Sequence, residues 1–223
     1  MKLGVLFSGG KDSTLATWLA KKNGYKIECL ISIISENKES YMFHTPSISK
    51  TKIQAMAMGI PLVVIKTKGK KETELKDLKK AILIAKRKYK IQGIVTGAVE
   101  SVYQASRIQK ICNEFNLECF NPLWQKNQFE LLDDLLKNKF EVVIMGVFAY
   151  PFDKSWLGRK IDRKFIEEMK ILNEKYKINP AGEGGEFESF VLYVPELFKR
   201  KLKVKNWEDF GEKNSWRGEV EAE

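Results

Sequence analysis

One hexapeptide near the amino terminus combines residue types that would suit a polyphosphate. Its sequence is Ser8-Gly9-Gly10-Lys11-Asp12-Ser13. Glycine lets a backbone approach an anion without an intervening Cβ, lysine adds a full positive charge, and serine hydroxyls add donors. The spacing matches neither G-x-x-x-x-G-K-[ST] nor G-x-G-x-x-G. A plain glycine turn is the alternative, but the clustering of lysine, aspartate and two serines favours an anion site.

The segments that flank this hexapeptide predict its place in a fold. Residues 3–7 form a short apolar run that is typical of a buried strand, and Leu15, Trp18 and Leu19 then recur at helical spacing. The hexapeptide therefore joins a strand to a helix. The amino terminus of that helix would present N–H groups and a partial positive charge to a bound anion.

Strand-like runs and helical patterns alternate through the first half of the chain. Further strands are predicted at residues 27–34, 61–65 and 91–95, each followed by an amphipathic helical pattern. The second helix is expected to begin at Thr45-Pro46, with threonine as its cap, and to end at Gly59. This alternation of strands and helices predicts an α/β fold with a doubly wound parallel sheet.

The regular alternation of predicted strands and helices changes after Asn121-Pro122. The pattern there predicts helices around residues 129–135 and 165–172, and strands at 142–148, 190–194 and 201–204. We therefore expect two domains, residues 1–122 and a smaller α+β domain at residues 123–223.

Composition narrows the classes of partner. The 223 residues include 39 Lys and Arg against 29 Asp and Glu, a net charge of +10. Only six of the basic residues are arginine, the side chain that suits bidentate recognition of bases and phosphates, so a direct nucleic-acid partner is not expected. Apolar runs fall short of the ~20 residues that span a bilayer, so we expect no membrane partner and a cytoplasmic location.

Cysteine and histidine usage limits the chemistry further. Cys29, Cys112 and Cys119 form no C-x-x-C pair, so buried free thiols are expected, and a zinc ribbon or a disulfide scaffold is not. His44 is the single histidine, which excludes a multi-histidine metal centre; it is either structural or part of a cleft. Lysine, carboxylates, hydroxyls and backbone amides must therefore perform most of the chemistry.

A second candidate group follows the fourth predicted strand. Glu100, Tyr103 and Arg107 are spaced 0, 3 and 7, which places them on one helical face. The carboxyl ends of strands in a doubly wound sheet are where ligands bind, so Arg107 is a candidate clamp for a substrate or phosphate. A solvent-exposed stripe with an internal ion pair is the alternative.

Three carboxylates lie in a glycine-rich segment, AGEGGEFES. They are Glu183, Glu186 and Glu188, and the last two share one face of the strand that follows. Carboxylates there could bind a cation or remove a proton from one, and an exposed acidic loop is the alternative. Trp124 and Trp156 are expected to pack between the domains, although either ring could also hold a cation.

SGGKDS after an amino-terminal strand resembles the PP-loop of ATP pyrophosphatases, which cleave ATP between the α and β phosphates. Further segments narrow the resemblance: YMFHTP at 41–46, GAVESVYQ with Arg107, NPLW at 121–124, WLGR with Ile161-Asp162, and GEGGEFES at 182–189. Together these segments resemble the diphthine–ammonia ligase family, short archaeal type, over nearly the whole chain.

This resemblance implies an AMP-forming ligase. ATP would activate the carboxylate of diphthine on translation elongation factor 2 as an acyl-adenylate, and ammonia would displace AMP to give diphthamide. ATP and Mg²⁺ are the implied cofactors, with Asp12 as metal ligand and Lys11, Asp12 and Glu186 as catalytic residues. The expected nucleotide-binding residues are Ser8, Gly9, Gly10, Lys11, Asp12, Ser13, Ser32 and Gly97. The expected substrate-binding residues are Glu100, Tyr103, Arg107, Glu183, Glu186 and Glu188.

Two other functions remain open on sequence grounds. A tRNA-modifying PP-loop enzyme that adenylates a base fits the basic charge, but the missing C-x-x-C pairs speak against it. A nonenzymatic ATP-binding module would need no paired lysine and aspartate in its phosphate turn.

Overall fold

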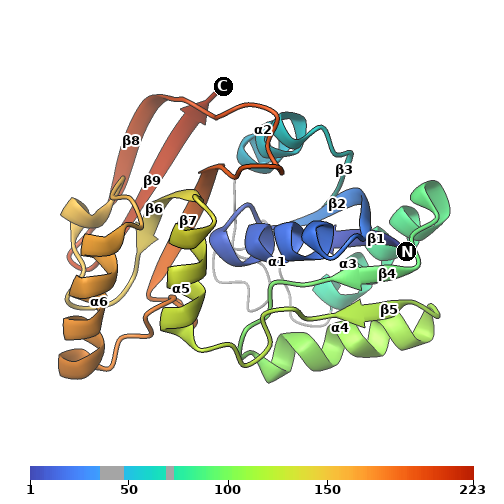
Figure 1. Ribbon diagram of the computed structural model, residues 1–223, viewed down its shortest axis with the longest axis horizontal. Helices are drawn as coiled ribbons and strands as arrows, with labels where there is room; N and C mark the ends of the chain where they lie inside the picture. Colours follow the sequence, from blue (N-terminus) through green and yellow to red (C-terminus); the bar gives the residue numbers. More distant parts are fainter. Residues whose placement is uncertain (36–47, 69–72) are drawn as a thin grey trace. The chain divides into compact units, whose positions relative to one another are not determined.

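The computed structural model describes residues 1–35, 48–68 and 73–223 (Figure 1). These residues form two compact units, Met1–Trp124 and Gln125–Glu223. Each unit contains one β-sheet, of five strands in the first and four in the second.

Unit 1 alternates strands with helices. Its elements are β1 (Lys2–Leu6), α1 (Lys11–Lys22), β2 (Lys26–Ser35), α2 (Ile48–Met58), β3 (Leu62–Thr67), α3 (Thr73–Tyr89), β4 (Gly93–Val95), α4 (Val102–Glu114) and β5 (Glu118–Phe120). The strands are parallel in the order β3-β2-β1-β4-β5. The order reverses between β1 and β4, so the predicted doubly wound fold is confirmed.

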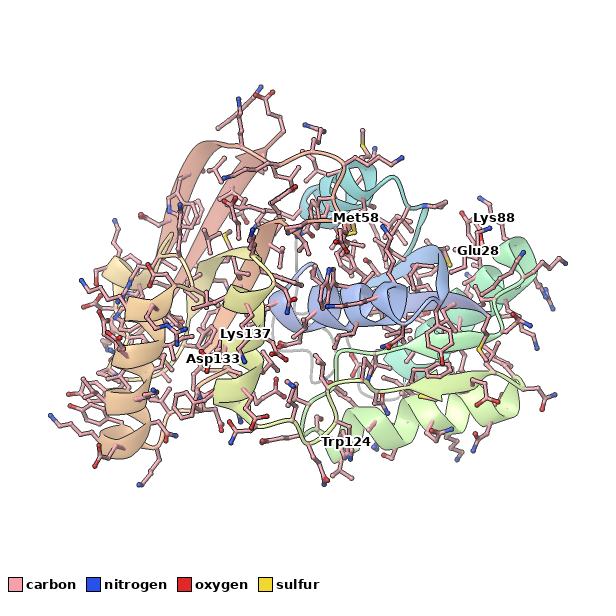
Figure 2. All side chains as sticks on the ribbon, in the orientation of Figure 1. Glu28, Met58, Lys88, Trp124, Asp133 and Lys137 are labelled. Atoms are coloured by element: carbon pink, nitrogen blue, oxygen red, sulfur yellow. The ribbon has the colours of Figure 1, made fainter. Side chains whose placement is uncertain are left out.

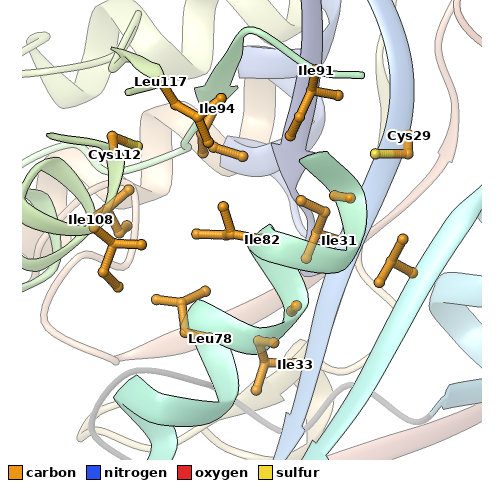
Figure 3. Close-up of a cluster of buried hydrophobic side chains, with 14 residues drawn as sticks. Cys29, Ile31, Ile33, Leu78, Ile82, Ile91, Ile94, Ile108, Cys112 and Leu117 are labelled. Carbon is orange, nitrogen blue, oxygen red and sulfur yellow. The ribbon is translucent and has the colours of Figure 1, made fainter. Parts of the chain in front are cut away.

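Alternating side chains of β2 separate the two faces of this sheet. Cys29, Ile31 and Ile33 point to one face, where they join Leu78 and Ile82 of α3 in a buried apolar cluster (Figure 3). The same cluster includes residues of α4, so α3 and α4 cover this face. The β2 residues between them point to the other face, which α1 and α2 cover.

Three details of unit 1 can be compared with the predicted elements. The short strand β5 was not predicted from the sequence. The expected helix start at Thr45-Pro46 lies outside the described residues. The expected helix end is confirmed, because α2 stops at Met58 and Gly59 follows with φ of 69°.

Unit 2 is an α+β structure, as predicted. Its elements are α5 (Gln128–Lys137), β6 (Glu141–Val147), the 3-10 helix η1 (Lys154–Trp156), α6 (Arg163–Tyr176), β7 (Phe187–Tyr193), β8 (Val204–Glu212) and β9 (Ser215–Ala222). The sheet is antiparallel in the order β7-β6-β9-β8. The strand predicted at 190–194 starts earlier, at Phe187, and the one predicted at 201–204 is wrong because β8 only begins at Val204.

Helix α5 is amphipathic. Leu131, Leu132 and Leu135 are completely buried, whereas Asp133 and Lys137 lie on its polar side (Figure 2). Asn127 caps the helix by accepting hydrogen bonds from two first-turn amides. This cap fixes where the helix starts and therefore the position of its first residue, Gln128.

None of the helices in the described residues combines the length and apolarity of a membrane span.

Candidate functional site

The phosphate-turn hexapeptide lies where the sequence predicts, between the end of β1 and the start of α1. Strand β1 is the centre of the sheet and pairs with both β2 and β4. The turn therefore lies at the carboxyl edge, beside the point where strand order reverses. Ligands of doubly wound folds bind at this position.

The backbone at Gly9 adopts a left-handed conformation that favours glycine. Its φ is +82°, and a Cβ there would lie 2.3 Å from Oε1 of Gln54. The Gln54 side chain, which comes from α2 and is completely buried, donates from Nε2 to the Gly9 carbonyl at 2.9 Å. Sequence reasoning missed Gln54, because nothing in the local pattern of α2 distinguishes it from a surface glutamine.

The first turn of α1 carries opposite charges side by side. Lys11 is only 4% exposed, and its Nζ lies 2.7 Å from Oδ2 of Asp12. The other carboxylate oxygen, Oδ1 of Asp12, is buried and has no hydrogen-bond partner within the described residues. A buried carboxylate oxygen in this state is a suitable ligand for a cation.

The two serines line the same turn. Their hydroxyl oxygens, Ser8 Oγ and Ser13 Oγ, are 3.1 Å apart, and Ser13 Oγ also accepts from the Ser8 amide at 3.3 Å. Gly10 is the N-cap of α1 and supplies no side-chain cap, whereas serine, asparagine or aspartate caps α4, α5 and α6. The start of α1 therefore lacks the N-cap side chain that would compete with a bound anion for its first amides, although the Gly10 amide itself donates to Ser8 Oγ at 3.4 Å.

The segment after β4 packs directly against this helix start. A Cβ on Gly97 would lie 2.7 Å from the Ser13 amide nitrogen and 2.8 Å from the Asp12 carbonyl carbon. Only glycine allows the two backbones to approach so closely. The preceding residue, Thr96, donates from Oγ1 to Oδ1 of Asn121 at 2.6 Å, which fixes the segment.

Ser32 faces the same edge of the sheet from β2. Its hydroxyl is buried and donates to the Phe7 carbonyl at 2.7 Å. This bond joins the end of β1 to β2 just before the phosphate turn.

The prediction that Glu100, Tyr103 and Arg107 share one helical face is wrong for Glu100. Helix α4 begins at Val102 after the cap Ser101, so Glu100 precedes the helix and is exposed. Tyr103 and Arg107 do share a face: the guanidinium carbon lies 3.4 Å from the tyrosine ring centroid. His44 lies outside the described residues.

The three glutamates of the glycine-rich segment lie in unit 2, and each is half-buried. Glu186 directly precedes β7 and accepts from the Asn179 amide at 3.0 Å through Oε1. Glu188 lies within β7, with its Oε1 3.8 Å from Nη2 of Arg217. Their partial burial differs from the alternative of a fully exposed acidic loop.

Trp156 belongs to an aromatic cluster. Its ring lies edge-to-face with Phe152 and Phe165, at centroid distances of 4.7 and 5.8 Å. The guanidinium carbon of Arg159 lies 4.0 Å from the Trp156 ring centroid, and Arg159 also pairs with Glu168 at 2.8 Å. An internal cation therefore already lies over this ring.

Cys29 and Cys112 are buried free thiols, as expected, whereas Cys119 is a free thiol that is only half-buried. Burial raises the pKa of Cys29 to about 12. A hydrogen bond between Cys112 and Cys119 raises the pKa of Cys112 and lowers that of Cys119. Across the described ranges, no group of three or more His, Cys, Asp or Glu side chains forms a metal cluster.

Comparison with known proteins covers both units. The diphthamide synthase N-terminal domain family model matches residues 1–119, and the diphthamide synthase C-terminal domain model matches residues 127–220. The diphthine–ammonia ligase of Bos taurus is 32% identical over 224 residues, which cover 92% of this chain and 83% of that protein. The diphthine–ammonia ligase of Homo sapiens has the same identity and coverage.

Several solved structures align along most of the chain. One of them is described as a predicted subunit of tRNA methyltransferase from Methanocaldococcus jannaschii, with 22% identity and a TM-score of 0.48. The alignment covers 89% of this chain and 100% of that one.

Proposed function

Because the chain belongs to the diphthamide synthase family, we propose that it converts diphthine on translation elongation factor 2 into diphthamide, using ATP and ammonia. It is thus a ligase that forms a C–N bond. The observation that carries the proposal is the phosphate turn at the carboxyl end of β1, with buried Lys11 at the start of α1. Neither a tRNA-modifying role nor a nonenzymatic role is favoured by the family match.

The reaction has two steps. A carboxylate oxygen of diphthine attacks the α phosphorus of ATP, and the bond between that phosphorus and the pyrophosphate oxygen breaks. Ammonia then attacks the acyl carbon, loses a proton, and displaces AMP to leave the amide. Charge grows on pyrophosphate in the first step, so fixed donors and cations near it lower the barrier.

The nucleotide would bind in unit 1. The amides of Gly9 to Ser13 and the hydroxyls of Ser8 and Ser13 would donate to the phosphate oxygens, and Lys11 would neutralise the leaving pyrophosphate. Gly97 would contribute by allowing the segment after β4 to pack directly against the start of α1. Ser32 would contribute by fixing the end of β1, since its hydroxyl already donates to Phe7.

Asp12 fits a magnesium ion, because its Oδ1 is a buried oxygen with no hydrogen-bond partner in the described part of the chain. Mg²⁺ usually binds proteins through one or two carboxylates together with water and substrate phosphates. When bound, it would neutralise phosphate charge. The pairing of Lys11 with Oδ2 keeps the carboxylate oriented.

Diphthine carries a trimethylammonium group beside its carboxylate, so its binding site needs negative charge. We assign this role to Glu183, Glu186 and Glu188 of unit 2, with Glu186 also accepting a proton from ammonium. Glu100, Tyr103 and Arg107 of unit 1 remain proposed contacts to the substrate carboxylate or to phosphate.

The distribution of charge supports this division. Residues 1–124 contain 21 Lys and Arg against 10 Asp and Glu, whereas residues 125–223 contain 18 against 19. The basic excess therefore lies in the unit proposed to bind the polyphosphate. We propose residues 1–122 as the ATP-binding domain and residues 123–223 as the substrate-binding domain. Because the partner is a translation factor, we also propose that the protein acts in the cytoplasm.

A reconstituted reaction tests the function. Purified protein, ATP, Mg²⁺, ammonium and diphthine-bearing elongation factor 2 should give diphthamide, detected by mass spectrometry of the modified peptide. Lys11→Ala should abolish the product, whereas Lys21→Ala, an exposed lysine of the same helix, should not. Removal of Mg²⁺ with EDTA should stop the reaction reversibly. Amide formation that is insensitive to Lys11→Ala would refute the proposed site.

A further inference from the structure

Gln128, the first residue of α5, uses both ends of its side-chain amide to hold another loop. The side chain is 8% exposed, its Oε1 accepts from the Ala181 amide at 2.9 Å, and its Nε2 donates to Oδ1 of Asn179 at 3.2 Å. Because a backbone N–H can only donate, the oxygen of Gln128 must face Ala181 and its nitrogen must face Asn179. The side chain therefore fixes two points of the segment 179–181.

The held segment in turn orients Glu186. The Asn179 backbone amide donates to Oε1 of Glu186 at 3.0 Å. A turn closes the connection between them, since the Gly182 amide donates to the Asn179 carbonyl and the Gly185 amide donates to the Gly182 carbonyl, each at 3.0 Å. A movement of Asn179 would therefore move the hydrogen bond that orients the carboxylate.

The carboxylate held in this way keeps one oxygen available. Oε2 of Glu186 is buried and has no hydrogen-bond partner among the described residues. The neighbouring backbone also closes around Oε1, because a Cβ on Gly184 would lie 2.6 Å from it. One oxygen is therefore fixed by the protein, and the other can accept a hydrogen bond from a small donor.

We propose that Gln128 is a positioning residue for Glu186, and that through Asn179 it directs Oε2 toward ammonium. This inference rests on the proposed amidation of diphthine. Gln128 is suited to the role because a carboxamide offers an acceptor and a donor at once. A methionine of similar length offers neither a comparable acceptor nor a donor, and a glutamate offers no donor when ionised.

Kinetics of Gln128→Met provide one part of the test. We expect kcat/KM for ammonium to fall at least tenfold while KM for ATP stays within twofold, because the nucleotide residues lie in unit 1. In a Glu186→Gln background the same substitution should cause little further loss, since the residue that it positions is already altered. Equal losses in both backgrounds would mean that Gln128 does not act through Glu186, and would overturn the proposal.

Hydrogen exchange provides a readout that does not depend on activity. Exchange of the Asn179 amide should accelerate at least tenfold in Gln128→Met, while the buried amide of Val191 in β7 keeps its protection. Unchanged Asn179 exchange in Gln128→Met would overturn the positioning role. Accelerated Asn179 exchange in Gln128→Met, combined with normal amidation by the separate variant Glu186→Gln, would refute the catalytic role of Glu186. The contact by which Gln128 positions Glu186 would then still stand.

Gln109→Met is the matched control. Gln109 is an exposed glutamine of α4 whose Nε2 also donates to an asparagine Oδ1, that of Asn113, at 2.8 Å. The Gln109→Met variant should change neither the kinetic constants for ammonium and ATP nor the exchange rate of the Asn179 amide. If Gln128→Met does not fold, Gln128→Glu serves instead: it retains an acceptor for Ala181 but loses the bond to Asn179, so the same two results are expected.

Discussion

Replacing Gly97 by alanine should weaken ATP binding by crowding the start of α1. The added Cβ would meet the Ser13 nitrogen at 2.7 Å, the Asp12 carbonyl carbon at 2.8 Å and the Ser13 Cα at 2.9 Å. All three atoms belong to the backbone, so no side-chain rotation relieves the overlap. The shortest of these distances, 2.7 Å, must grow by about 0.7 Å before ordinary van der Waals contact is restored, so the segment must separate from the helix start by that amount.

Such a shift acts directly on the proposed phosphate site. Overpacking of this kind typically costs about 1–3 kcal/mol of stability, and displaced donors lose their alignment with phosphate oxygens. We expect the Kd for ATP to rise at least tenfold. Isothermal titration calorimetry with ATP and Mg²⁺, at a temperature well below the unfolding transition, measures this change.

Gly93→Ala, at the first residue of strand β4, is the matched control. Its Cβ would meet Leu3 Cδ2 at 2.9 Å and the Glu118 carbonyl oxygen at 3.0 Å, so crowding is comparable, but these contacts lie within the sheet. Both variants should unfold at lower temperature, and only Gly97→Ala should bind ATP more weakly. Equal ATP affinities in the two variants would refute the reasoning.

Two substitutions in the site and one labelling experiment in the core give three further predictions. Glu186→Gln should reduce diphthamide formation at least tenfold with ATP affinity unchanged, and exposed Glu130→Gln should alter neither; parallel loss of ATP binding would refute the assignment. Gln54→Met should weaken ATP binding several-fold in calorimetry, because the carbonyl of the phosphate turn loses its donor; an unchanged Kd would contradict this positioning role. Cys29, whose pKa is raised to about 12, should stay protonated and resist iodoacetamide at pH 9 until the protein unfolds, as peptide mass spectrometry would show; rapid labelling of the native protein would contradict its burial.

The fold of the first unit could be predicted from the sequence because the patterns that indicate its strands and helices lie within short stretches of the chain. Apolar runs and helical spacing indicate the strands and helices of a doubly wound sheet, and Gly59 indicates the end of α2. The exception, β5, has only three residues, of which Glu118 is exposed, so no apolar run indicates it.

The carboxyl-terminal hairpin could not be predicted in the same way. Strands β8 and β9 are rich in charged residues, and they are joined by Lys213 and Asn214, which lack the glycine typical of a two-residue hairpin. Pairing with β6, which is distant in sequence, determines the position of β9 in the sheet.

The candidate site shows the same contrast between local and distant contacts. The phosphate turn depends on six consecutive residues and was predicted correctly in its place. The start of α4 was predicted too early, because the capping-box spacing of Ser101 and Gln104, whose amide donates to the serine hydroxyl, was not used. Gln54 and Gln128 could not be identified, because each contacts a loop 45 or more residues away in the sequence. Only the folded chain brings these amides to the loops that they hold.

The central claim is that the turn from Ser8 to Ser13 holds the triphosphate so that ATP breaks between its α and β phosphates. Labelled ATP tests this claim most directly, in a single turnover with diphthine-bearing elongation factor 2 and ammonium. If ATP breaks at that bond, α-labelled ATP yields AMP, γ-labelled ATP yields pyrophosphate, and Lys11→Ala yields neither. Release of labelled ADP and inorganic phosphate in step with amide formation would contradict it.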